Sequence, residues 1–85
     1  MERSGSRIRA NRKQQKALLS LLRGMRKEAG MRQIDLATAL HLPQSYVSKY
    51  ESGDRRLDAL ELYAVCCQLG VSMAEFGRRL DELLK

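Results

Sequence analysis

The chain is poor in the residues that build β-sheet folds. Its 85 residues include one proline and no tryptophan, and aromatic residues make up only 5%. This composition disfavours sandwiches and barrels, which need aromatic strand residues and many turns. An all-helical fold is therefore expected. A chain of this length builds one small core, which leaves little room for the deep pocket of most enzymes.

Metal ligands and reactive groups are also scarce. The two cysteines, Cys66 and Cys67, are adjacent, and His41 is the single histidine. These residues cannot supply four zinc ligands at a usual spacing, and neighbouring cysteines rarely form a disulfide. Both cysteines are expected to be small apolar residues of a helix. We expect no metal and no cofactor, and the lack of a nucleophile paired with a base argues against an enzyme.

Long apolar runs are missing as well. The longest, residues 62–67, is far shorter than the roughly 20 residues that a membrane span requires. No apolar segment follows the basic N-terminus, as a secretory signal would require. The expected location is therefore cytoplasmic.

Positive charge is concentrated at one end of the chain. Residues 1–32 contain ten Lys or Arg and two Glu, a net charge of +8, whereas residues 33–85 contain six basic and eight acidic residues, a net charge of −2. A polyanion-binding protein needs such a region, because neutralising phosphates releases counterions. A charged tail that only keeps the protein soluble is the alternative.

Residues 1–14 are expected to form a flexible, disordered basic arm ahead of a domain comprising residues 15–85. Ile8 is their one sizeable apolar residue, so the segment cannot bury enough surface to offset the entropy lost on ordering. Two interpretations of its arginines stay open: contact with nucleic acid in a minor groove, or no contact at all. These arginines are Arg3, Arg7, Arg9 and Arg12.

Apolar spacing and helix-ending glycines predict five helices in the domain. The first runs from residue 15 to Gly30, and a short second one begins near Gln33. The third covers residues 44–52, so only three or four residues join it to the second. The fourth and fifth follow residues with capping-box spacing, at Asp58 and Ser72. Helices of this length cannot stand alone in water, so a compact bundle is predicted.

The third helix has one polar and one apolar face. At about 100° per residue, its polar residues fall within an arc of about 140°, and Val47 and Tyr50 point to the opposite side. Amide and hydroxyl groups of this kind read base edges in a major groove. An ordinary solvated helix face is the alternative. The polar residues are Gln44, Ser45, Ser48 and Lys49.

The short second helix, the tight turn and the amphipathic third helix form a helix-turn-helix arrangement after a basic segment. The residues of this segment that form a recognisable pattern are Arg26, Gly30, Gln33, Leu36-Ala37, the run Val47-Ser48-Lys49-Tyr50-Glu51-Ser52-Gly53 and the ending Leu69-Gly70-Val71-Ser72. In these residues the stretch from Leu22 to Phe76 resembles the lambda-repressor-like domain, also called Cro/C1-type, of the XRE family.

The resemblance implies a sequence-specific regulator of transcription, more often a repressor, that binds double-stranded DNA. A homodimer on a palindromic operator would place its two third helices about 34 Å apart. The implied base-reading residues are Gln44, Ser45, Ser48 and Lys49, and Arg26 and Glu51 are implied to form a structural ion pair. The expected phosphate contacts are Gln33, Arg32, Ser52, Arg55 and Arg56.

Two departures from the family pattern concern helix ends. Arg32 stands where the family usually has a threonine or serine cap, a loss of about 1 kcal/mol unless Asp35 compensates through the helix dipole. Pro43 replaces a common serine cap, and Leu57 replaces a common proline before the fourth helix. Both changes put loop conformation in question and leave the fold intact.

The fifth helix carries more apolar residues than a small core needs, which makes it the candidate dimer surface. The alternative is that all of these residues complete the core. A second function of a different class uses the same stripe: an antitoxin or an adaptor that binds a foreign protein through this fold. The residues concerned are Phe76, Leu80, Leu83 and Leu84.

Overall fold

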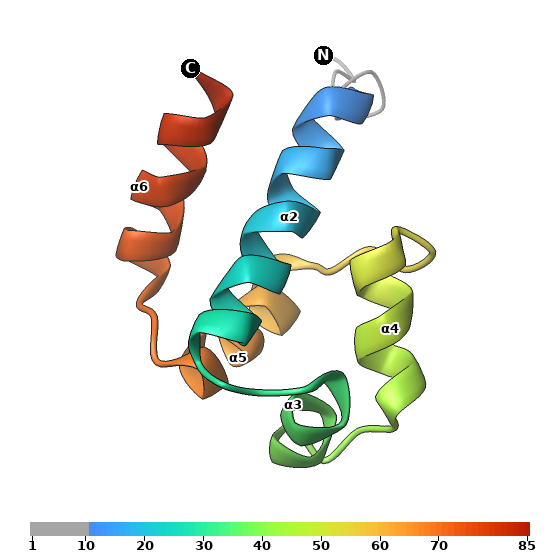
Figure 1. The fold of residues 1–85 in the computed structure, drawn as a ribbon. Coiled ribbons are helices and arrows are strands. Elements are labelled where there is room, and N and C mark those ends of the chain that lie inside the picture. The colour runs from blue at the N-terminus through green and yellow to red at the C-terminus, as the bar shows by residue number, and fades with distance from the viewer. Residues whose placement is uncertain (1–10) are drawn as a thin grey trace.

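The computed structural model describes residues 11–85, which form five helices (Figure 1). Helices α2 and α6 lie side by side, and α3 and α4 lie on the other side of α2. Within this range there is no strand, so the all-α prediction and the helix order are confirmed. The helices are α2 (Arg12–Glu28), α3 (Gln33–Ala39), α4 (Gln44–Ser52), α5 (Ala59–Leu69) and α6 (Met73–Leu84).

Helix α2 begins at Arg12 and not at residue 15 as predicted. Asn11 is its N-cap: the Asn11 Oδ1 accepts a hydrogen bond from the Gln14 backbone N–H at 2.8 Å, and the Gln14 side-chain oxygen accepts from the Asn11 N–H at 3.3 Å. This reciprocal pair is a capping box, a signal that the sequence analysis passed over. Arg12 therefore belongs to the helix. The other arginines of the expected arm, Arg3, Arg7 and Arg9, lie outside the described residues.

The core lies where the helices meet, and every helix contributes to it. Val47 and Tyr50 of α4 are fully buried, as their predicted inward face requires. Phe76 is 3% exposed and packs in the core. Its expected place on a dimer surface is therefore corrected: Phe76, near the start of α6, is a core residue. The buried apolar residues are Leu22, Met25, Leu36, Ala37, Val47, Tyr50, Val65, Cys66, Leu69 and Phe76.

A tight turn sets α4 at an angle to α3. His41 has a φ of 60°, a left-handed conformation that redirects the chain, and the Leu42 N–H donates to the Ala37 carbonyl at 2.9 Å. Pro43 then occupies the N-cap of α4 with a φ of −65°, the value its ring imposes. Gly53 ends α4 with a φ of 92°, where a side chain would be strained.

A buried ion pair joins α2 to the end of α4. The Arg26 Nε donates to Glu51 Oε2 at 2.7 Å and its Nη2 donates to Glu51 Oε1 at 3.0 Å. The Arg26 Nη1 donates to the Met31 carbonyl at 2.8 Å. Only 8% of the Arg26 side chain and 4% of the Glu51 side chain are exposed. The expected pair is thus present, in a two-pronged geometry shielded from water.

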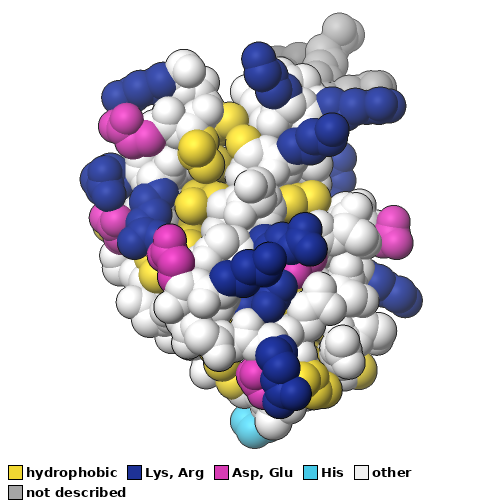
Figure 2. Space-filling view, in the orientation of Figure 1, with side chains coloured by type: hydrophobic (Ala, Val, Ile, Leu, Met, Phe, Trp, Pro, Cys, Tyr) yellow, Lys and Arg dark blue, Asp and Glu magenta, His cyan; other side chains and the backbone are white. Residues whose placement is uncertain are grey.

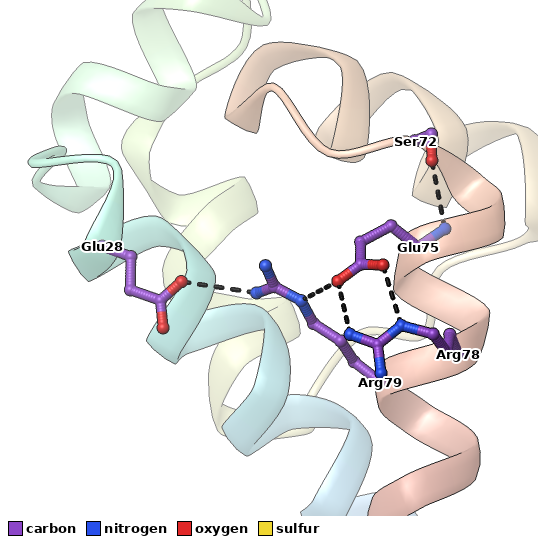
Figure 3. A network of polar contacts seen from close by, with 5 residues as sticks. All are labelled: Glu28, Ser72, Glu75, Arg78 and Arg79. Atoms are coloured by element: carbon purple, nitrogen blue, oxygen red, sulfur yellow. Dashed lines mark hydrogen bonds and ion pairs between the residues drawn. The ribbon is translucent and has the colours of Figure 1, made fainter.

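A second polar network holds α6 against α2 (Figure 3). Glu75 accepts hydrogen bonds from Arg78 and Arg79, and Arg79 also donates to Glu28 of α2 at 3.3 Å. The Ser72 hydroxyl caps α6 by accepting from the Glu75 N–H at 3.0 Å. Hydrogen bonds from Arg78 and Arg79 lower the pKa of Glu75 to about 2. Because these side chains are at the surface, the network orients α6 more than it stabilises the fold.

Within residues 11–85, no single helix is long and apolar enough to cross a membrane. Only α5 and α6 taken together, with a bend of 103° between them, reach the required length and apolar content.

Replacing either partner of the buried ion pair is expected to destabilise the domain strongly. Arg26→Met or Glu51→Leu leaves one buried charge uncompensated, so the free energy of unfolding should fall by about 3–5 kcal/mol. The double variant should regain part of this loss, because no lone charge then remains. Urea unfolding followed by circular dichroism measures all three, and a double variant as unstable as the sum of the single ones would contradict the assignment.

Candidate nucleic-acid interface

The polar face of α4 points to solvent. Gln44, Ser45 and Lys49 are exposed, and Ser48 is half-buried with its hydroxyl donating to the Ser45 carbonyl at 3.4 Å. On the opposite face Val47 and Tyr50 are fully buried. The structure therefore brings the four expected base-reading residues together on one accessible side of α4. Gln44 stands at its N-terminal end, where a groove-inserted helix first meets base edges.

Gln33 is attached to the buried ion pair. Its Nε2 donates to Glu51 Oε1 at 3.0 Å, so Glu51 links the start of α3 to the end of α4. Burial by itself raises the pKa of Glu51, but hydrogen bonds from Arg26 and Gln33 and the charges of Arg26 and Arg23 outweigh it and lower this pKa. A fixed carboxylate thus orients the amide that is expected to hold a phosphate.

Arg32 is bound by its own helix. It occupies the N-cap of α3, where Asp35 accepts from its backbone N–H at 2.8 Å and from its Nε and Nη2 at 2.9 Å each. These bonds lower the pKa of Asp35 to about 2. Asp35 thus satisfies the backbone N–H of the N-cap, which is half of a capping box, whereas the arginine side chain cannot accept from the first-turn N–H groups as a serine cap would. The Arg32 guanidinium, although exposed, already has a carboxylate partner.

Arg55 also faces its own domain. Its Nη2 forms an ion pair with Glu61 of α5, and its guanidinium lies 4.7 Å from the centre of the Tyr46 ring. Tyr46 in turn meets Tyr50 edge to face, with ring centres 5.9 Å apart, so Tyr46 packs against its own domain. Glu61 is therefore an ion-pair partner of Arg55 as well as a capping residue of α5. Its other oxygen accepts from the Asp58 N–H at 2.9 Å.

Ser52 and Arg56 are exposed where α4 ends and the following loop begins. The Ser52 hydroxyl donates to the Lys49 carbonyl at 3.0 Å and keeps its lone pairs free to accept. Of the three arginines expected to touch phosphates, Arg56 is the one that the described residues leave without an ion pair. Its position beside α4 suits a contact with a phosphate of the DNA backbone.

The two cysteines differ in their exposure to solvent. Cys66 is buried, which raises the pKa of its thiol and keeps it neutral, and Cys67 is exposed on α5. In the range 11–85, no three His, Cys, Asp or Glu side chains gather as a metal site would require.

The fold and the outward polar face of α4 define a helix-turn-helix DNA-binding domain. Residues 22–76 match the family model described as Helix-turn-helix. The chain belongs to the Cro/C1-type, or XRE, family of helix-turn-helix proteins, whose fold is that of DNA-binding transcription regulators.

Solved structures of this family are similar over most of the chain. An XRE-family like protein from Pseudomonas syringae pv. tomato str. DC3000 is 38% identical with a TM-score of 0.78, covering 85% of this chain and 88% of that one. The clp gene regulator ClgR from Corynebacterium glutamicum is 28% identical with a TM-score of 0.72, covering 85% and 92%. A second structure of ClgR is 29% identical with a TM-score of 0.71, covering 81% and 73%. No curated protein matches the chain.

Gln33→Glu tests the attachment of Gln33 to Glu51. The variant places a second carboxylate 3.0 Å from a buried one, and two such groups cannot both be ionised without cost. We expect the free energy of unfolding at pH 7 to fall by about 1–3 kcal/mol below that of Gln33→Ala, which only removes the hydrogen bond.

The loss of stability caused by Gln33→Glu is expected to depend on pH. In the folded variant the pKa of the carboxylate pair is raised, so the penalty is present above that pKa and disappears as pH falls and one group takes up a proton. The two variants should therefore converge toward pH 5 in urea unfolding. A gap that stays constant with pH would show that residue 33 and Glu51 are not in contact.

Proposed function

We propose that this protein is a sequence-specific transcription regulator, acting as a repressor, that binds a palindromic operator as a homodimer. The observation that carries the proposal is the exposed polar face of α4, held outward by the buried Val47 and Tyr50 on its other side. Family membership supports DNA as the ligand, and ClgR, a similar protein, is described as a gene regulator.

Chemistry divides the interface into two kinds of contact. Gln44 offers an amide that bonds adenine at N6 and N7 together, and Ser45 and Ser48 offer hydroxyls to several base edges. Lys49 serves either guanine or a phosphate. Arg56, Gln33 and Ser52 are the expected contacts to phosphates of the DNA backbone, which set the position of the protein without reading sequence. Repression then requires only that the occupied operator be closed to the transcription machinery.

Gln44→Ala should separate base reading from backbone binding. We expect it to weaken binding to the selected operator by about 1–3 kcal/mol and to spare binding to random duplex, because only the operator presents the matching base. Fluorescence anisotropy with duplexes selected from a random pool measures both. Arg56→Gln is the matched control, since it should weaken both and lower the salt dependence. Equal losses on the two duplexes for Gln44→Ala would remove its base-reading role.

The end of α6 supports the dimer proposal. Leu83 is 53% exposed and Leu84 is 41% exposed, and Leu80 is half-buried beside them. Leu80 lies one turn before Leu83 and Leu84, so the three leucines can form an apolar surface that matches a copy of itself across a two-fold axis. Helix α5 also has an exposed pair, which the sequence analysis did not single out: Leu60 at 79% and Tyr63 at 56%.

Replacing the two leucines of α6 by glutamate tests which pair joins the copies. We expect Leu83→Glu with Leu84→Glu to convert the dimer into a monomer, because four carboxylates would then face one another across the axis. Sedimentation equilibrium reports the mass, and Leu60→Glu is the control on α5. Loss of the dimer with the control alone would move the interface to α5.

The exposed pair on α5 also favours one alternative function. As an antitoxin or adaptor, the protein would use Leu60 and Tyr63 to hold a foreign protein. Selection from a random duplex pool distinguishes the two functions: an enriched two-fold symmetric sequence supports the regulator, and no enrichment supports the alternative.

A further inference from the structure

A stripe of basic side chains runs along α2, apart from the residues discussed so far. Its positions are separated by four, four, three and four residues, so they share one side of the helix within an arc of about 80°. All are exposed. Figure 2 shows dark blue side chains gathered over α2 and toward α4. We call this set the α2 stripe: Arg12, Lys16, Ser20, Arg23 and Lys27.

The middle of the α2 stripe borders a hollow between α2 and α4. The hollow has a volume of about 460 Å³. Ser52 in its wall lies four residues after Ser48 and seven after Ser45, on the same side of α4 as the base-reading face. The hollow is therefore continuous with that face. Its lining residues are Lys16, Leu19, Ser20, Arg23, Glu51 and Ser52.

The cations of this hollow are available to an anion. No carboxylate among residues 11–85 forms an ion pair with Lys16 or Arg23. The one acidic lining residue, Glu51, forms an ion pair with Arg26 at 2.7 Å and also accepts a hydrogen bond from the uncharged amide of Gln33. Its charge is thus satisfied inward and leaves the positive potential of the hollow in place.

Two expected phosphate ligands have been drawn into internal contacts. Arg32 is bound by Asp35, and Arg55 pairs with Glu61 and lies over Tyr46. Each would have to exchange a carboxylate for a phosphate, which gains little net electrostatic energy. Within residues 11–85, the positive charge left unpaired beside α4 is therefore that of Arg56 and that of Lys16 and Arg23 on α2.

We propose that the hollow is a phosphate-binding site, in which Lys16 and Arg23 hold a DNA backbone phosphodiester next to the groove that α4 enters. This inference rests on the proposed DNA binding and adds a contact surface to it. The planar fork of Arg23 matches two phosphate oxygens, the Lys16 ammonium supplies a compact charge, and Ser20 offers a hydroxyl donor. Helix α2 thereby becomes part of the interface and not only a support for α4.

The test compares Lys16→Gln, Arg23→Gln and the double variant with Arg78→Gln. Arg78 is the matched control, because it lies on α6, its side chain is 63% exposed and its loss removes the same charge. Anisotropy titrations over a range of NaCl concentrations use the selected operator and a random duplex. The slope of log affinity against log salt falls by about 0.9 for each phosphate that is no longer neutralised. Because Lys16 and Arg23 hold the same phosphodiester, the double variant should lose about 0.9 for each copy of the chain bound to the duplex.

The same loss should appear on both duplexes, because phosphates carry no sequence information. Slopes of the double variant equal to those of Arg78→Gln would overturn the proposal, and circular dichroism melting confirms that each variant is folded. The random duplex keeps the two proposals distinguishable. If the wild type selects no operator, base reading fails, and the random-duplex slopes still decide whether Lys16 and Arg23 hold phosphates.

Discussion

The carboxylate of Glu51 is the point on which the arrangement of helices depends. It is almost fully buried and accepts hydrogen bonds from Arg26 of α2 and Gln33 of α3. Arg26 extends the connection to the chain between these helices through the Met31 carbonyl. A buried charge demands such partners, because leaving it alone in the interior costs several kcal/mol. The end of α4 is therefore fixed against two other helices, and its polar face has one direction in which to point.

Local ion pairs determine which arginines remain available to a ligand. Asp35 binds Arg32, Glu61 binds Arg55, and Glu75 binds two arginines of α6. Each acidic residue starts a helix, where its carboxylate accepts a nearby backbone N–H or lies near the positive helix end. At Asp35 and Glu61 the same side chain accepts an N-cap backbone N–H and pairs with an arginine, whereas Ser72 caps α6 and Glu75 forms only ion pairs. Among residues 11–85, positive charge remains unpaired mainly along α2, so these basic residues form a surface with a defined position.

The similarity to known structures indicates which positions of the sequence determine the fold. Identities of 28% to 38% accompany TM-scores of 0.71 to 0.78 over most of the chain. Such agreement requires the core positions and helix ends to be equivalent, since these set how the helices pack. The side chains on the exposed face of α4 are free of that requirement. They can therefore differ between members of one family without changing the fold.

Local patterns in the sequence determined most of this protein. Apolar spacing, terminal glycines and capping residues act within a few residues of one another, so they fixed the helices and the inward face of α4 before any packing was known. The start of α2 could also have been predicted from the sequence, because Asn11 and Gln14 form a local cap. The role of Phe76 and the pairing of Arg55 with Glu61 and Tyr46 depended on which helix approaches which. Contacts between residues distant in the chain exist only after the core has closed, so only the tertiary structure decided them.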